Sequence, residues 1–311
     1  MKKNNMVYGI IGVGVRNGNY NASFDRTPKQ NSLGEMYASP QCLGFAIKEQ
    51  LNKEGCKILY RKSIGEKGVR KLEETFEHLT ETKLDAKKMT ENDVKEIMFK
   101  QFIDIRLFGC TFAVAPNFGI KGAIQIGMGF NKYEDTEILI SELLAPFAAE
   151  KKEKKNDEDK QSNTLGEQII VDEAHYVHGF TIDPYEYEQY IGMVKDFEGF
   201  TDEDYAVFKN ASLISVSNYN SKSKAGCQNE FSIFVETNND VKNLINLNAM
   251  EQYITIYKEN KVVYDLTELS KILNDIKDNI KSVEIYYNPY TLEIKHNLDA
   301  KIYSIITRKE I

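Results

Sequence analysis

The sequence lacks several patterns that define common classes of protein. Its four cysteines are widely spaced and form no CxxC pair, and each lies among apolar or small residues. Reduced, buried thiols are therefore expected, which favours a cytoplasmic location. No window is long and apolar enough to span a bilayer, so no membrane partner is expected. The motifs GxxxxGK(S/T), GxSxG and HExxH are absent as well, so the chain carries no familiar nucleotide-binding or catalytic signature of these kinds.

The apolar run Met6–Val15 near the N-terminus is interrupted by three glycines. No small-x-small cleavage site follows it, so an export signal is not indicated. Its segment GIIGVG has the glycine content of a dinucleotide-binding fingerprint, but that fingerprint requires a strand-to-helix turn, and no helix follows here. The run predicts the first core strand.

Charge is unevenly distributed along the 311 residues. Forty Lys and Arg against 47 Asp and Glu give a net charge of −7, which by itself argues against nucleic acid as a partner. Three Gly/Asn-rich segments, 16–30, 118–133 and 218–229, nevertheless carry +2 each, so the remainder carries −7 − 6 = −13. Basic loops on an acidic body predict local binding of phosphate groups. The alternative is that a chain of this length contains such windows by chance.

The stretch from residue 102 to residue 130 is the most informative part of the chain. It begins with an apolar run, predicted to be a strand, in which Asp104 and Arg106 share one face because side chains alternate along a strand. Two interpretations remain open for this pair. The residues either pair across a sheet, or Arg106 reaches a ligand phosphate while Asp104 braces it.

A second, glycine-rich run follows in the same stretch and contains Gln125, Gly127 and Gly129. Glycine is kept inside a strand where the backbone must bulge or where another backbone approaches closely. No acid occurs between Asp104 and Glu134. The run therefore predicts a surface that receives a polyanion.

Elsewhere the sequence predicts loosely alternating helices and strands. Ser39 caps a helix that begins at Pro40 and stops at Gly55, and Thr90 and Thr201 cap two others. The predicted helices cover 39–55, 69–79, 90–102, 185–210 and 266–280, and the predicted strands cover 6–15, 57–62, 168–182, 231–236, 253–257, 283–287 and 301–307. This order favours an α+β domain over a strictly wound parallel sheet.

The segment 150–164 carries five lysines and five acids and no apolar side chain. It cannot bury enough surface to offset its ordering entropy, which predicts a disordered insertion within a single domain 1–311.

The histidines of the HxxH motif, His175 and His178, would share a face on a helix, as metal ligands require. The flanking residues QIIVDEA and VHGFTI favour a strand, where this odd spacing sends the two rings to opposite faces. We therefore expect buried, hydrogen-bonded histidines, no metal site and no cofactor.

Two loops carry further candidates. Asp25 lies beside Arg26, and a carboxylate in this setting is commonly a turn former; the alternative is a general base for RNA cleavage. The loop 218–229, NYNSKSKAGCQN, carries Lys222 and Lys224 among amide side chains. It suits contacts to phosphates and 2′-hydroxyls, and a plain solvated hairpin loop is the alternative.

Several of these segments match one protein family in their order along the chain. They are GIIGVGVRNGNYN, SFDRTPK, SPQCLGFAIKEQL, FIDIRLFG, KGAIQIGMGF, LGEQIIVDEAHYVHGF and YNSKSKAG. Together they resemble the Cas7 family, the repeated backbone subunit of type I CRISPR surveillance (Cascade) complexes, most closely the Csh2-like subunit of subtype I-B. The resemblance covers the chain up to about residue 236.

The resemblance implies an RRM-like (ferredoxin-like) palm with inserted helical and β-hairpin elements. It also implies that copies stack head-to-tail along one CRISPR RNA, beside other Cascade subunits, and present the spacer for pairing with target DNA without doing chemistry. The predicted RNA-binding residues are Asn19, Asn21, Arg26, Lys29, Arg106, Lys121, Gln125, Gly127, Gly129, Lys222 and Lys224. The alternative is a type III-like backbone subunit in which Asp25 cuts target RNA.

Overall fold

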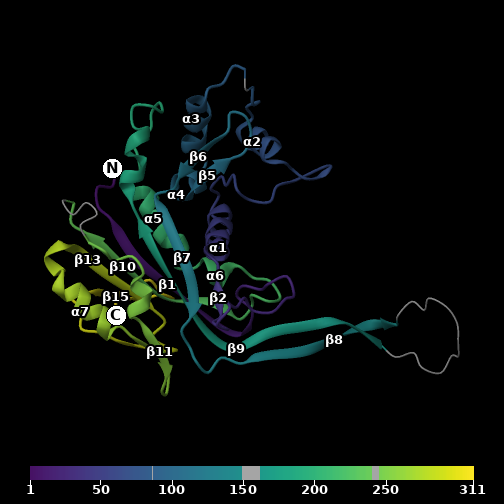
Figure 1. Cartoon of the computed structure of the whole chain (residues 1–311), viewed down its shortest axis with the longest axis vertical. Coiled ribbons are helices and arrows are strands. Elements are labelled where there is room, and N and C mark those ends of the chain that lie inside the picture. Colours follow the sequence, from purple (N-terminus) through teal and green to yellow (C-terminus); the bar gives the residue numbers. More distant parts are fainter. Residues whose placement is uncertain (86, 149–161, 240–244) are drawn as a thin grey trace.

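The computed structural model describes residues 1–85, 87–148, 162–239 and 245–311. Its centre is an eight-stranded sheet with the order β15-β13-β10-β1-β9-β7-β2, in which β8 also pairs with β9 (Figure 1). All of these neighbours are antiparallel except β13 and β15. The strands are β1 (Val7–Gly18), β2 (Tyr37–Ala38), β7 (Ile124–Asn131), β8 (Ile138–Ala148), β9 (Ser162–Ile182), β10 (Cys227–Thr237), β13 (Ile280–Tyr287) and β15 (Lys301–Ser304).

Both faces of the central strand β1 are buried. Val7 and Ile11 belong to a core shared with the helices α1 (Pro40–Lys53) and α5 (Asp202–Ser212). The intervening Tyr8 and Ile10 belong to a second core on the opposite face. This alternation follows from the two-residue repeat of a strand. The short helix α6 (Ser215–Asn218) packs beside α1.

The second core is covered by the C-terminal part of the chain. A three-stranded sheet and a helix supply its apolar side chains, including Ile256, Tyr264 and Leu269. These elements are β11 (Thr255–Lys258), β12 (Val262–Asp265), β14 (Leu292–Lys295) and α7 (Thr267–Asp275), with the 3-10 turns η2 (Met250–Tyr253) and η3 (Lys277–Asn279). Over β1, β9 and β7 this face is only partly covered, because Tyr8, Thr181 and Gln125 line an open hollow there.

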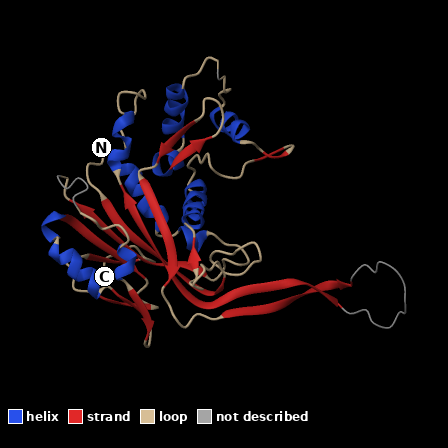
Figure 2. Ribbon diagram, viewed as in Figure 1, coloured by secondary structure: helices blue, strands red, loops and turns tan. Residues whose placement is uncertain are grey.

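A helical lobe is inserted between α1 and β7 and lies beside the sheet (Figure 2). It contains α2 (Leu72–Thr80), α3 (Glu91–Gln101), α4 (Ile103–Phe108), the hairpin of β3 (Ile64–Gly65) and β4 (Gly68–Val69), and the hairpin of β5 (Gly109–Phe112) and β6 (Phe118–Lys121). The three predicted helix caps are confirmed, whereas the helix predicted from residue 69 begins at Leu72. The side chains of Ser39, Thr90 and Thr201 each accept a hydrogen bond from the first turn of α1, α3 and α5.

Strands β8 and β9 form a long hairpin that projects away from the body (Figure 1). The predicted disordered insertion 150–164 follows β8 in the sequence. Residues 150–161 of that insertion are outside the described residues, and 162–164 belong to β9. After β9, Asp183 caps the 3-10 helix η1 (Pro184–Tyr190), and α5 then begins after Thr201, as expected.

Two of the predicted strands are wrong. Residues 57–62 form no strand, and residues 103–108, which contain Asp104 and Arg106, form helix α4. Strand β8 was not predicted at all. Helix α4 ends at Gly109, whose φ of 66° lies in a region that glycine adopts readily. By contrast, His175 and His178 lie in β9 and enter opposite cores, as expected.

Candidate nucleic-acid interface

Two of the three basic segments meet next to the start of α1. The backbone N–H of Asn19 donates to the carbonyl of Ser223 at 2.7 Å, and the N–H of Arg16 donates to the carbonyl of Gly226 at 2.8 Å. A Cβ on Gly226 would lie 1.8 Å from the Arg16 oxygen, so only glycine permits this approach. The structure therefore joins segments 16–30 and 218–229 into one surface, although 187 residues lie between them in the sequence (218 − 30 − 1).

Cations gather at this junction. The ammonium of Lys224 lies 5.2 Å from the centre of the Tyr20 ring and 3.9 Å from Sγ of Cys42. Burial raises the pKa of the Cys42 thiol, and the positive charges of Lys224 and Lys29 act against that rise. Lys222 is exposed in the same loop. Among the described residues, no acid forms an ion pair with any of these three lysines.

The start of α1 is held against the same loop. Asn21 Oδ1 accepts the backbone N–H of Ser39 at 2.9 Å, and Ser39 Oγ accepts the N–H of Cys42 at 3.3 Å. No acid occurs in the first turn of this 14-residue helix. No side chain of the first turn therefore neutralises the partial positive charge at the helix N-terminus, and this charge adds to that of the lysines.

A groove runs from this junction along α1 to β7. It consists of three adjoining hollows of about 300, 490 and 710 Å³. The first two share Gln41 and Phe45 on α1, and the last two share Gln125 and Ile126 on β7. Gly44 lies between these points with no heavy atom within 4 Å of where a Cβ would stand, so the helix surface is open there.

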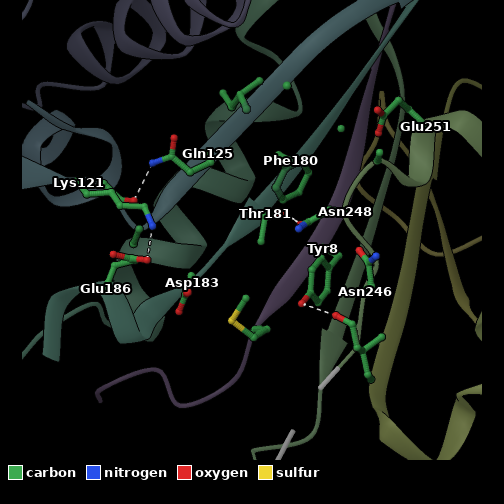
Figure 3. A pocket seen from close by; sticks show the side chains of 18 residues that line it. Tyr8, Lys121, Gln125, Phe180, Thr181, Asp183, Glu186, Asn246, Asn248 and Glu251 are labelled. Atoms are coloured by element: carbon green, nitrogen blue, oxygen red, sulfur yellow. Dashed lines mark hydrogen bonds and ion pairs between the residues drawn. The ribbon is translucent and has the colours of Figure 1, made fainter. Parts of the chain in front are cut away.

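The far end of the groove is acidic (Figure 3). Lys121 pairs with Glu186, and the side chains of Asp183 and Glu251 also line this hollow. Burial raises the pKa of both Asp183 and Glu251. The segment 118–133 is acid-free in sequence, but other elements bring acids to it. The attraction for phosphate is therefore strongest at the Lys224 end.

Gly127 and Gly129 have different surroundings, although both lie in β7 at a register shift against β9. Gly127 is exposed and lines the groove, and a Cβ there would meet only the Gly179 oxygen, at 3.3 Å. A Cβ on Gly129 would lie 2.3 Å from the His178 ring. Gly129 thus serves the packing of the core, and Gly127 remains a candidate contact.

Three of the polar residues singled out in the sequence have structural partners instead. Asn19 is 3% exposed, and its amide donates to the carbonyls of Arg26 and Ile169. Asp104 is buried and accepts the backbone N–H groups of residues 59 and 60. Arg106 binds Asp204 of α5 through two hydrogen bonds of 2.7 and 2.6 Å.

The predicted relation between Asp104 and Arg106 is therefore wrong. On a helix, residues two apart point in different directions, so the pair does not share a face. Asn19 and Arg106, both predicted to bind RNA, have structural roles, because the first is buried and the second is held in a bidentate ion pair.

Asp25 is a turn former. Its Oδ1 accepts hydrogen bonds from the backbone N–H and the hydroxyl of Thr27, at 3.1 and 2.7 Å. These bonds lower the pKa of the carboxyl, which makes it a weaker base. The neighbouring Arg26 is exposed, has a φ of 70°, and approaches Gly166 of β9.

Several groove residues were not predicted from the sequence. Tyr20, Gln41, Phe45, Lys48 and Tyr219 line it, yet they lie in a loop and on helices where apolar or amphipathic side chains are ordinary. The 3.6-residue repeat of α1 could have identified three of these residues. Gln41, Phe45 and Lys48 are three or four residues apart and share the helix face that does not enter the core.

Within the part of the chain that the structure describes, no cluster of three or more His, Cys, Asp or Glu side chains is suited to a metal ion. Over the same residues, no helix combines the length and apolarity that crossing a bilayer requires.

Fold and groove together define an α+β protein with a helical insertion, a projecting hairpin and a polyanion-compatible groove. The sequence profile of CRISPR-associated protein Cas7 matches residues 5–282, so the chain belongs to the Cas7 family. This confirms the family predicted from the sequence; the subtype stays a prediction. A search of curated proteins finds no match.

Solved structures with a similar fold come from CRISPR complexes. A chain of a "CRISPR RNA-guided surveillance complex, pre-nicking" aligns with a TM-score of 0.52 and 14% identity, covering 94% of this chain and 96% of the other. A chain of a "CRISPR RNA-guided surveillance complex" gives a TM-score of 0.52 and 13% identity, covering 91% and 88%. At such identities the likeness concerns the fold.

Proposed function

We propose that this Cas7 protein binds CRISPR RNA along the groove beside α1, forms a head-to-tail filament on it, and presents the spacer for pairing with target DNA. Other Cascade subunits complete the complex, in the cytoplasm, and subtype I-B is the proposed setting. The observation that carries this proposal is the row of three adjoining hollows, which extends from the lysines at Tyr20 to the exposed backbone at Gly127.

The groove chemistry suits a backbone-directed, sequence-independent contact. Cations and a helix N-terminus attract phosphates, and the side chains of Phe45 and Tyr219 offer apolar surface to sugars or bases. The ring centres of Phe45 and Tyr219 are 5.4 Å apart. Base readers are not required, because pairing with the target supplies the sequence specificity.

We infer an RRM-like (ferredoxin-like) palm from the connectivity. The elements β1, α1, β7, β9, α5 and β10 follow one another in the order βαββαβ, and their strands lie in the spatial order β10-β1-β9-β7. That antiparallel 4-1-3-2 arrangement supports the assignment. Much of the sheet face on which RRM domains stack bases is covered here by α7 and the β11-β12-β14 sheet. The part that stays open, over β9 and β7, is the last hollow of the groove, which favours the groove as the binding surface.

The β8–β9 hairpin is proposed as the thumb-like element that contacts the next copy in the filament. Its residues Ile138, Leu139 and Ile140 are 37%, 39% and 64% exposed on an arm that projects from the body (Figure 1). Exposed apolar runs of this kind mark interaction surfaces. A heterologous contact between copies produces an open filament whose length the RNA sets.

We propose that the subunit does no chemistry. The carboxylate considered for RNA cleavage, Asp25, is engaged by Thr27 and has a lowered pKa. A general base at neutral pH is favoured by the opposite shift.

Assembly on a synthetic guide RNA tests the proposal. The full chain should form ladders of complexes whose size increases by one subunit per fixed length of RNA, with protection from nuclease at the same interval. Binding of isolated monomers without a repeat, or no binding at physiological salt, would contradict it.

A further inference from the structure

The most basic short segment of the chain meets the groove only at Tyr60. Residues 60–71, YRKSIGEKGVRK, contain five cations and one acid, a charge of +4. They form the β3–β4 hairpin, which projects beside α2 (Figure 2). None of its five cations lines the three hollows of the proposed RNA groove.

Hydrogen bonds hold the two strands of the hairpin together. The N–H of Arg70 donates to the Ser63 carbonyl at 2.9 Å, and its guanidinium donates to Ser63 Oγ at 2.9 Å and to the Ile64 carbonyl at 2.6 Å. Arg70 thus ties one strand to the other. Lys62 and Lys67 are exposed, and no acid among the described residues pairs with either.

A hollow of about 420 Å³ lies between this hairpin and α1. Its lining includes four cations and no acid, in contrast to the far end of the RNA groove, where acids outnumber the one lysine. The four are Lys48, Arg61, Lys62 and Arg70. Arg61 is balanced by Glu49, at 2.7 Å, so the uncompensated charge comes mainly from the other three.

This hollow opens off the groove rather than continuing it. It shares Phe45, Lys48 and Tyr60 with the middle hollow, whereas the groove itself continues to β7 through Gln125 and Ile126. Ile64 and Val69 are 70% and 62% exposed on the hairpin and offer apolar contact to sugar edges.

We propose that the β3–β4 hairpin, with Lys62 and Lys67, binds the sugar–phosphate backbone of the target strand that pairs with the guide. This rests on the proposed function. A strand that pairs with RNA held in the groove must run beside it, so its phosphates meet a cationic surface that branches from the groove. The contact is sequence-independent, because lysines bind phosphates as point charges.

The test uses the full chain assembled on a guide RNA, with a fluorescent complementary DNA strand as the probe. The variant Lys62→Gln/Lys67→Gln is compared with Lys277→Gln/Lys301→Gln, two exposed lysines of the C-terminal part. Each lysine–phosphate interaction removed should weaken capture of the DNA roughly fivefold at about 0.1 M salt and lower the salt slope by about 0.7, so the double variant should lose roughly 25-fold and lower the slope by about 1.4. Assembly on the RNA should be unchanged, and Lys62→Arg/Lys67→Arg should retain capture.

The outcomes separate the two proposals. If the hairpin variant loses RNA assembly in parallel with DNA capture, the hairpin binds the guide and the assignment to the target strand is wrong. If neither changes, the hairpin binds no nucleic acid. If the wild-type chain does not assemble on RNA at all, the proposed function fails first. Equal weakening by the control pair would show only a general charge effect and would also overturn the inference.

Discussion

The hydroxyl of Tyr20 lies 3.3 Å from Nε2 of His178, deep beneath the basic junction. On its other side, the His178 ring bonds the carbonyl of Gly127 through Nδ1, at 3.0 Å. The carbonyl can only accept, so Nδ1 carries a proton. Burial lowers the pKa of His178, so the ring is neutral and its Nε2 accepts a hydrogen bond from the Tyr20 hydroxyl. Since Lys224 lies over the Tyr20 ring, one buried chain of contacts connects the lysines to the exposed bulge of β7.

The two glycines of β7 should respond differently to substitution. Gly129→Ala places a methyl group into the His178 ring and should destabilise the fold by about 2 kcal/mol. Gly127→Ala meets only one oxygen at 3.3 Å, so it should leave the melting temperature within a few degrees and weaken assembly on RNA. Thermal unfolding and RNA gel shifts measure both. Equal destabilisation of the two variants would make the Gly127 position structural too.

Lysines at the junction should act by binding phosphates. Lys222→Ala/Lys224→Ala should weaken RNA binding equally for all sequences. The slope of log K against log[salt] should fall by about 0.7 for each phosphate that the variant no longer neutralises. Lys277→Ala is the control, because it removes one positive charge from an exposed site, as each of the two substitutions does. An unchanged slope in the double variant would remove this loop from the groove.

Arg106 and Asp204 should behave as a structural pair. Arg106→Ala leaves the nearly buried carboxylate of Asp204 without its partner and should cost about 3 kcal/mol of unfolding free energy. Asp204 retains its bonds to Thr201, so the protein should still fold. A double-mutant cycle with Asp204→Asn, followed by urea unfolding, measures the coupling. A stable Arg106→Ala protein with defective RNA binding would restore the predicted contact role.

Acid should weaken the fold through His178. Burial lowers the pKa of this histidine to about 4, while the unfolded chain titrates near 6.5. The neutral ring therefore stabilises the fold fully above pH 6.5, and this contribution declines by up to about 1.4 kcal/mol per pH unit as the pH falls towards 4. The contribution of His175 to the pH dependence has the opposite sign. Burial lowers the pKa of His175, but nearby carboxylates, chiefly that of Glu230, raise it by more, so its pKa is raised overall. Urea unfolding of wild type and His178→Gln between pH 7 and pH 5 isolates the effect; an NMR midpoint near 6.5 for His178 would contradict it.

Catalysis is tested at Asp25. The assembled protein should leave a complementary target RNA intact, and Asp25→Ala should change neither stability nor DNA targeting substantially, because the residue only closes an exposed turn with Thr27. Denaturing gels of end-labelled target RNA report cleavage. Cuts at the interval of the subunit repeat that disappear in Asp25→Ala would establish the type III-like alternative.

Local signals made much of the fold predictable. The caps at Ser39, Thr90 and Thr201 depend on neighbours within three residues, so the sequence alone locates the helix starts. Helix α4 could not be predicted in this way. Its few residues are fixed by partners far along the chain, since Arg106 binds Asp204 and Asp104 accepts backbone bonds from residues 59 and 60. In strand β8, none of residues 138–143 is buried, so this part of the strand shows no alternation of buried and exposed side chains.

The site was predictable in part for the same reason. Counting charges within a segment selected the loops around Lys29 and Lys224, and the structure brings these two loops together. It failed at Lys121, because Glu186 arrives from another element. The basic hairpin 60–71 shows the reverse case: its charge of +4 was visible in the sequence, but its position beside the groove was not.

The most direct measurement of the central claim is the size of the RNA that copurifies with the full chain from its native host. The proposed function predicts short RNAs of uniform length, protected by several copies of the subunit. An RNA-free protein, or bound RNA of random length and origin, would contradict it.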